Sequence, residues 1–135
     1  MKLAISQIRK KLPFNFSYDF DLMANLVNKP DLLACKKCLV EGVIFEQSNE
    51  RFLVRMSFDL DLVFQCAISL EEVPYQLQFD QDVYFSYDDS DDDYPIERET
   101  LNIDLAVLSE IVINLPYRVV KEEYEDTLPT EEEEL

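Results

Sequence analysis

The chain has 135 residues, of which 47% are hydrophobic and 12% are aromatic, values typical of one globular domain that buries a core without a metal or disulfide. It contains 29 acidic and 12 basic residues, one glycine and no histidine. The lack of histidine excludes Ser-His and Cys-His nucleophiles and imidazole metal ligands, and a single glycine is too few for a P-loop or a dinucleotide-binding turn.

The net charge of −17 is unevenly distributed along the chain. Residues 1–38 carry a net charge of +4, and the remainder carries −21. A body this acidic repels phosphates and attracts basic partners, although such a charge also serves solubility alone. If the basic N-terminal third contacted RNA directly, the contacts would come from Arg9, Lys10, Lys11, Lys36 and Lys37.

Targeting signals are absent from the sequence pattern. Three cysteines, an odd number, argue against a secreted disulfide framework. No apolar run approaches the roughly 20 residues of a membrane span, and the first residues lack the apolar stretch and cleavage site of a signal peptide. We therefore expect a cytoplasmic protein.

The N-terminal third predicts short elements. Ile5, Ile8 and Leu12 have helical spacing in "ISQIRKKL" and predict a short basic helix. The alternating aromatic residues of "PFNFSYDFDL" predict a strand. The segment "DLMANLVNKPDLL" predicts one or two helical turns that end at Pro30.

Three longer strands are predicted next. Residues 38–47 form the first, in which Gly42 is expected to mark a bulge. Every even position from Phe52 to Cys66 is apolar, and most odd positions in 73–85 are apolar. Because side chains alternate between the faces of a strand, these two runs predict an antiparallel hairpin with one buried face.

A helix is predicted after the aspartate-rich loop at 87–94. Asp104 is expected to be its N-cap, and Pro116 is expected to end it. The wide apolar arc of this helix indicates that it is either deeply buried or partly in contact with a partner. The residues of its main apolar stripe are Leu105, Leu108, Val112 and Leu115, with Val107 and Ile111 beside them.

The order of these elements predicts an α+β domain over residues 1–118. It is an antiparallel β-meander of four to five strands with a C-terminal helix packed on the sheet, and a short N-terminal helix. Residues 119–135 are acidic, contain proline and have few apolar residues. We expect this tail to be disordered.

The cysteines are candidate metal or redox groups. Cys35 and Cys38 form a C-x-x-C pair, but a structural zinc needs four ligands and no second pair exists. No helix begins after the pair to favour a redox role. Cys66 is in phase with the buried positions and is predicted to be a small core residue. We therefore expect no metal and no cofactor. We also expect no catalytic residues, because no combination of nucleophile, base and oxyanion donors can be named.

Acidic residues and a neighbouring tyrosine are the candidate partner-binding groups. Aromatic and acidic side chains together suit the capture of basic side chains. These candidates are Asp88, Asp89, Asp91, Asp92, Asp93, Tyr94, Glu131, Glu132, Glu133 and Glu134.

Four segments occur in an order that resembles a known family. These are "VEGVIFEQ" (40–47), "FLVRMSFDLDLVFQC", "YPIERETLNIDL" and "SEIVINLP". They resemble the glycine-bearing strand, the strand ending in C-x-R-C, the approach to an I-D-L motif and the following glutamate and L-P of the YceD family of bacteria and chloroplasts. The resemblance covers roughly residues 38–118. The matching positions are Gly42, Cys66, Ile103, Asp104, Leu105, Glu110, Leu115 and Pro116.

The chain departs from the family pattern after Cys66, because Ile68 and Ser69 stand where the family has arginine and a second cysteine. A role that needs two thiols therefore does not carry over. The pair at Cys35 and Cys38 is similar to the motif but lies one strand too early.

The resemblance implies a part in the accumulation of large-subunit ribosomal RNA, and so in ribosome assembly. With a net charge of −17, we hypothesise a non-enzymatic factor that engages a basic protein, such as a ribosomal protein or an rRNA-processing factor, and meets rRNA indirectly. Direct RNA contact through the N-terminal third and acidic mimicry of nucleic acid stay open as alternatives.

Overall fold

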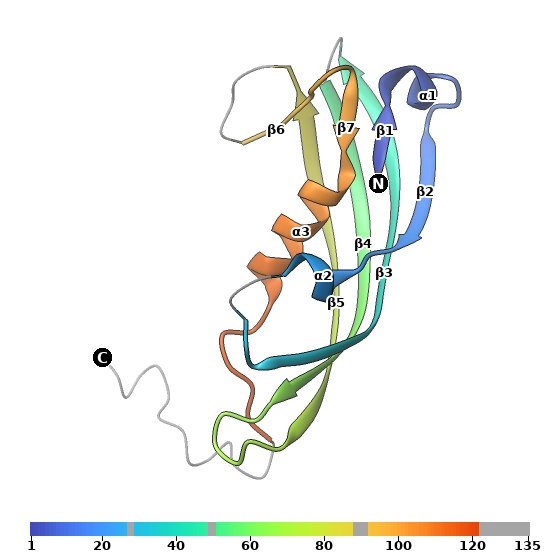
Figure 1. Ribbon diagram of the computed structural model, residues 1–135. Coiled ribbons are helices and arrows are strands. Elements are labelled where there is room, and N and C mark those ends of the chain that lie inside the picture. The colour runs from blue at the N-terminus through green and yellow to red at the C-terminus, as the bar shows by residue number, and fades with distance from the viewer. Residues whose placement is uncertain (27–28, 49–50, 88–91, 122–135) are drawn as a thin grey trace.

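The structure is a computed structural model, which describes residues 1–26, 29–48, 51–87 and 92–121. Its elements, in chain order, are β1 (Lys2–Ala4), α1 (Ile5–Arg9), β2 (Phe14–Asp19), α2 (Leu22–Asn25), β3 (Leu32–Ser48), β4 (Arg51–Gln65), β5 (Glu72–Ser86), β6 (Tyr94–Pro95), β7 (Thr100–Asn102) and α3 (Ile103–Asn114). They form a five-stranded sheet in the order β2-β3-β4-β5-β6, a two-stranded sheet of β1 and β7, and a helix, α3, against the larger sheet (Figure 1). The predicted α+β class is confirmed.

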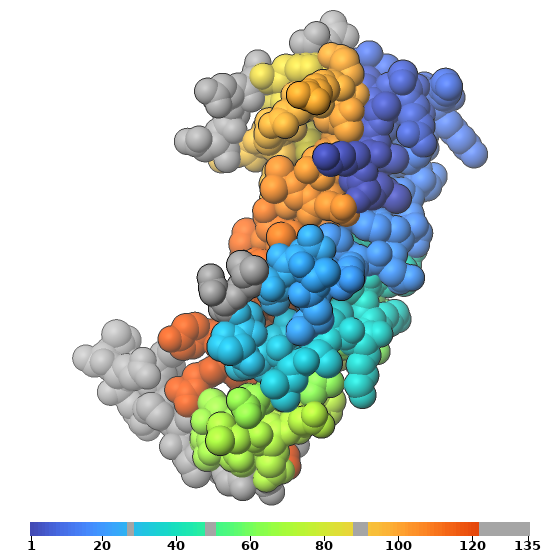
Figure 2. Space-filling model, viewed as in Figure 1, coloured from blue at the N-terminus to red at the C-terminus, as the bar shows by residue number. Residues whose placement is uncertain are grey.

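The three long strands β3, β4 and β5 form the body of the molecule as an antiparallel meander. The even-numbered apolar residues of β4 are buried on the face toward α3, and the odd positions lie on the opposite, outer face. The predicted hairpin of β4 and β5 is confirmed, with Phe58 opposite Phe79 and their rings stacked 4.3 Å apart. The molecule is long and bowed, with α1 and β6 at one end and the β4–β5 turn at the other (Figure 2).

Two pairings of short strands were not predicted. β1 pairs antiparallel with β7, and β6 pairs parallel with β5 through Phe85 and Ser86. The meander is therefore antiparallel except at β6. Strands of two or three residues are too short to show an alternating pattern, so the sequence carried no signal for them.

Helix α3 buries a different stripe from the one predicted. The residues that face the sheet are Ile103, Ala106, Val107, Glu110 and Ile111. By contrast, Leu105 and Val112 of the predicted stripe are 43% and 48% exposed. Because α3 is apolar on nearly every side, periodicity alone does not determine which face meets the sheet.

The start of α3 also differs from the prediction. Its N-cap is Asn102, whose side-chain oxygen accepts a hydrogen bond from the Leu105 N–H at 3.3 Å. Asp104 lies inside the first turn, where a carboxylate is favoured by the positive end of the helix dipole. The prediction of Asp104 as the N-cap is therefore wrong.

Gly42 does not mark a bulge. It lies in continuous register between Phe16 of β2 and Met56 of β4. A Cβ atom at this position would lie 2.3 Å from Cζ of Phe16, so glycine is needed to admit the aromatic ring. The register shifts of β3 lie instead between Leu32 and Ala34, between Cys35 and Lys37, and between Glu46 and Ser48.

The N-terminal elements are shorter than predicted. In α1, Ile5 and Ile8 are buried, but Leu12 lies beyond the helix and is 41% exposed. Helix α2 is a single turn, capped by Asp21 and finished well before Pro30. As a result β3 begins earlier than the predicted strand and contains both cysteines of the C-x-x-C pair.

The chain after α3 returns along the sheet toward the β4–β5 turn (Figure 1). The Ala67 N–H donates to the Val119 carbonyl at 2.9 Å, and Val119 is buried. The folded domain thus continues past residue 118 to Lys121, and the rest of the predicted tail lies outside the described residues. Within the described parts of the chain, no helix has the length and apolar character needed to cross a membrane.

Candidate functional site

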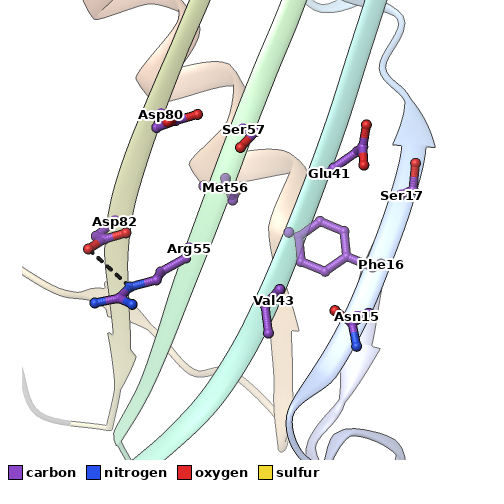
Figure 3. Close-up of a pocket in the computed structure, with 11 residues that line it drawn as sticks. Asn15, Phe16, Ser17, Glu41, Val43, Arg55, Met56, Ser57, Asp80 and Asp82 are labelled. Atoms are coloured by element: carbon purple, nitrogen blue, oxygen red, sulfur yellow. Dashed lines mark ion pairs between the residues drawn. The ribbon is translucent and has the colours of Figure 1, made fainter.

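The outer face of the sheet carries an open groove of about 690 Å³. Figure 3 shows its polar side chains projecting into one space from four strands, β2 to β5. They form two cross-strand rows, Asn15–Val43–Arg55–Asp82 and Ser17–Glu41–Ser57–Asp80. Each row is assembled by the register of the meander from residues that alternate outward on their own strands.

The charges of the groove are unbalanced. Glu41 and Asp80 lie on either side of Ser57 in one row, and neither forms an ion pair with another described residue. The guanidinium of Arg55 lies 3.4 Å from Asp82. Three carboxylates and one guanidinium give the lining a net charge of −2, which suits the binding of ammonium or guanidinium groups.

Acidic side chains continue along the same face beyond the groove. Lys37 donates to Asp59 at 2.7 Å, and this hydrogen bond lowers the pKa of Asp59 and raises that of Lys37. The side-chain amides of Gln78 and Gln76 donate to Asp59 and Asp61, at 3.2 and 3.3 Å. The groove and this neighbouring region together carry six carboxylates and two basic groups on the outer face. They are Asp19, Glu41, Asp59, Asp61, Asp80, Asp82, Lys37 and Arg55.

Of the aspartates predicted to bind a partner, the structure describes Asp92 and Asp93. Asp93 is held by Arg51 through two hydrogen bonds of 3.1 and 3.3 Å, and this contact lowers the pKa of Asp93. The Asp93 side chain is only 8% exposed and its carboxylate is paired with Arg51 of the same chain, so it presents little surface to a partner. Asp92 is exposed. The candidates outside the described residues are Asp88, Asp89, Asp91, Glu131, Glu132, Glu133 and Glu134.

Tyr94 faces the interior and contacts α3. Its hydroxyl donates to Glu110 at 3.2 Å, and its ring centroid lies 5.4 Å from that of Phe85. Burial raises the pKa of Tyr94. At the opposite edge of the sheet, on β2, the Tyr18 hydroxyl donates to Asp104 at 2.7 Å. Two carboxylates at motif positions therefore attach α3 to both edge strands of the sheet, β2 and β6.

The other motif positions in and after α3 differ in burial and contacts. The pKa of Asp104 is lowered although burial opposes this, because the amino group of Met1 and the Tyr18 hydroxyl both contact the carboxylate. Ile103 is fully buried and Leu105 is exposed. Leu115 and Pro116 are partly buried where the chain leaves the helix.

Cys35 and Cys38 are brought together by the register shift between them. They lie opposite Leu62 and Leu60, so both side chains face the interior. Burial raises the pKa of Cys35 and raises that of Cys38 to about 12, which keeps both thiols protonated at neutral pH. No three His, Cys, Asp or Glu side chains among the described residues are placed to hold a metal ion.

Cys66 is fully buried, as predicted, but outside the main core cluster. Its sulfur accepts hydrogen bonds from the N–H groups of Ser69, at 3.4 Å, and Lys121, at 3.5 Å. Burial favours the thiol, but these and neighbouring hydrogen bonds prevail and lower the pKa of Cys66 to about 6. Cys66 therefore joins the β4–β5 turn to the C-terminal segment.

The basic residues proposed for RNA contact are not gathered into one patch. Arg9 forms two hydrogen bonds with Glu46, at 2.7 and 3.1 Å, near one end of β3. Lys37 is paired with Asp59 near the other end. At about 3.3 Å per residue, the nine residues from Lys37 to Glu46 separate these two groups by roughly 30 Å. Lys10, Lys11 and Lys36 are exposed.

Sequence reasoning missed the groove residues Glu41, Arg55, Asp80 and Asp82. The available signal was the polar half of each alternating strand, which predicts only a solvated face. Their juxtaposition depends on the register between strands that are far apart in sequence. Comparison of the chain with models of known protein families, with curated proteins and with solved structures found no match.

Proposed function

We propose that this chain is a non-enzymatic binding protein that engages a basic protein through the acidic outer face of its sheet, and that this binding serves assembly of the large ribosomal subunit. The observation that supports the binding most directly is the row of Glu41, Ser57 and Asp80. It holds two carboxylates in an open groove with no basic partner among the described residues.

Electrostatics determines what kind of partner fits this groove. A guanidinium group can donate two parallel hydrogen bonds to a carboxylate, and an ammonium group can lie between two carboxylates. Exposed ion pairs contribute little individually, so binding needs several contacts along the face. Such binding is fast, favours basic partners and weakens with salt.

The ribosomal setting of the proposal is supported by the resemblance to the YceD family. Ribosomal proteins are strongly basic and bind nucleic acid nonspecifically through their Lys and Arg side chains. An acidic surface can cover those side chains until the protein reaches its site. The net charge of −17 disfavours an unaided grip on RNA, which is why we place the protein partner first.

Binding of purified basic ribosomal proteins at low and high salt tests the proposal. The double variant Glu41→Gln/Asp80→Asn is expected to bind about tenfold more weakly, equivalent to ~1.4 kcal/mol. Glu97→Gln/Glu99→Gln removes the same charge from an exposed turn outside the groove and is the matched control. Equal losses in both variants would show that net charge acts without the groove. An absence of binding at low salt would reject the proposal.

The ribosomal setting needs its own test. After depletion of the protein, ribosome profiles on sucrose gradients are expected to show a deficit of large subunits. A normal ratio of large to small subunits would contradict the ribosomal role. The binding assay would still decide whether the acidic face engages basic proteins.

Mimicry of nucleic acid is a second candidate function, favoured by the six carboxylates arranged on a folded face. A mimic binds through the charge of the whole face, so Asp19→Asn/Asp61→Asn would weaken binding as much as Glu41→Gln/Asp80→Asn. Duplex DNA would also displace it from its partner. A loss confined to the groove variant favours the groove.

A further inference from the structure

The edge of β5 is open over most of its length. β5 pairs with β4 from Glu72 to Ser86 without a register shift. On its other side, β6 covers only Phe85 and Ser86. From Gln76 to Asp82, no other described strand pairs with this edge. An unpaired strand of this length presents a row of backbone donors and acceptors.

The direction of these backbone groups follows from two observations. The Ile96 N–H donates to the Ser86 carbonyl at 2.9 Å, so the backbone polar groups of Ser86 face away from β4. In an antiparallel pair this direction alternates, so every even-numbered residue of β5 shares it. Pro74, which has no N–H, falls in the same phase, where no bond to β4 is needed.

Four residues therefore direct their backbone groups toward the open edge, namely Gln76, Gln78, Asp80 and Asp82. Each offers one N–H and one carbonyl, which makes eight groups in all. One of the eight, the Asp82 carbonyl, accepts a hydrogen bond from the exposed side-chain amide of Gln81 at 3.2 Å. An incoming strand would replace this contact. The groups span about 20 Å, which matches a segment of about seven residues.

The side chains along this edge differ between the two faces of the sheet. The even residues lie on the outer face, where Asp80 and Asp82 line the groove. The odd residues Leu77 and Phe79 lie on the inner face and are only partly buried. A strand added here would place alternate side chains beside the carboxylates and the others beside Leu77 and Phe79.

Charge selects the occupant of the edge. A second copy of this chain would bring together two molecules that each carry a net charge of −17, and repulsion opposes that pairing. A segment with alternating basic and apolar residues complements both faces.

We propose that β5 accepts such a segment of the basic partner as an added strand along Gln76–Asp82. This inference rests on the proposed function and specifies how the partner binds.

Backbone-methylated peptides test the proposal. The probe is a peptide of about seven alternating lysine and valine residues, with one version N-methylated at the lysines and another at the valines. In a bound peptide strand, every second N–H group faces β5. In an antiparallel arrangement these are the N–H groups of the lysines. Methylation of that set is expected to weaken binding at least about tenfold, whereas methylation of the other set leaves it unchanged. Equal affinities of both versions, or no binding of the parent peptide at low salt, would overturn the proposal.

Variants of the edge give a second test. Gln78→Pro removes an N–H that the proposal uses and that β4 does not, and Gln78→Ala removes the same side chain but keeps the N–H. Only the proline variant is expected to lose peptide binding, and circular dichroism checks that it folds. Amide hydrogen exchange supplies a readout without substitution, because the peptide should slow exchange at residues 76, 78, 80 and 82. Unchanged exchange at these amides in the complex would count against the added strand.

These tests separate the two proposals. Both methylated peptides keep every positive charge, so charge attraction alone cannot distinguish them. Binding that depends on Glu41 and Asp80 but is insensitive to methylation would overturn strand addition and support the acidic groove. The binding part of the proposed function fails if basic proteins do not bind, and the ribosome profiles test its ribosomal part separately.

Discussion

At the scale of single residues, two positions of the family-like motifs have physical explanations in the structure. Gly42 is required because the ring of Phe16 occupies the space that a side chain would fill. Cys66 is required as an acceptor that joins the β4–β5 turn to the segment around Lys121. Neither role needs a partner, so changes at these residues should affect folding before binding.

Substitution of Gly42 by alanine is expected to destabilise the fold. The new Cβ would lie 2.3 Å from Cζ of the buried Phe16 ring, and such overpacking typically costs about 1–3 kcal/mol. Urea unfolding measures the change. Adding Phe16→Leu should recover part of the loss in the double variant. Full stability of Gly42→Ala alone would contradict the close approach.

Cys66 is expected to make stability depend on pH. Its pKa of about 6 lies below the value of about 8.5 for an unfolded cysteine. The unfolded state therefore binds the proton more tightly, and the contribution of Cys66 is complete above pH ~8.5 and declines as the pH falls toward about 6. The melting temperature of the parent relative to that of Cys66→Ala should therefore rise as the pH is raised from about 6 to about 8.5. Cys35→Ala is the control, and a constant difference would contradict the low pKa.

At the scale of elements, α3 shows how packing selects one face of a uniformly apolar helix. Tyr18 on β2 and Tyr94 on β6 donate to Asp104 and Glu110 from opposite edges of the sheet. With both carboxylates held, Ile111 points into the core, and Leu105 is left exposed. The rotation of the helix about its axis is therefore fixed by polar contacts as well as by burial.

Alanine substitutions distinguish the two faces of α3. Ile111→Ala is expected to cost about 2–5 kcal/mol, because Ile111 is fully buried and its loss leaves a cavity. Leu105→Ala is expected to cost less than about 1 kcal/mol, because Leu105 is 43% exposed and lies outside the core. Chemical denaturation of both variants measures these values. The reverse order would restore the stripe predicted from the sequence.

At the scale of the whole molecule, the net charge of −17 opposes the compact state. Repulsion acts most strongly where carboxylates share a face and form no ion pair with another described residue, as at Glu41 and Asp80. The same charges that suit a basic partner thus reduce the stability of the free protein. A partner that neutralises them should raise its stability by mass action.

Added salt is expected to stabilise the free protein. The screening length falls to about 10 Å at 0.1 M ionic strength, so distant carboxylates cease to repel one another. The melting temperature should rise with sodium chloride. Glu41→Gln/Asp80→Asn should melt higher than the parent at low salt and respond less to added salt. A fall in melting temperature with salt would show that the ion pairs of the fold outweigh its repulsion.

The α+β class, the long β4–β5 hairpin and the burial of Cys66 could all be predicted from the sequence. These features depend on alternation within single segments, where each side chain lies on one face or the other. The acidic character of the molecule also follows from composition alone.

The groove, the role of Gly42 and the buried face of α3 depend on contacts between segments that are distant in sequence. Glu41, Asp80 and Asp82 meet because of strand register, which links residues about 40 positions apart. The position of the Phe16 ring decides that residue 42 has no room for a side chain. The face of α3 follows from its contacts with the sheet, because a helix that is apolar on nearly every side carries no preference of its own.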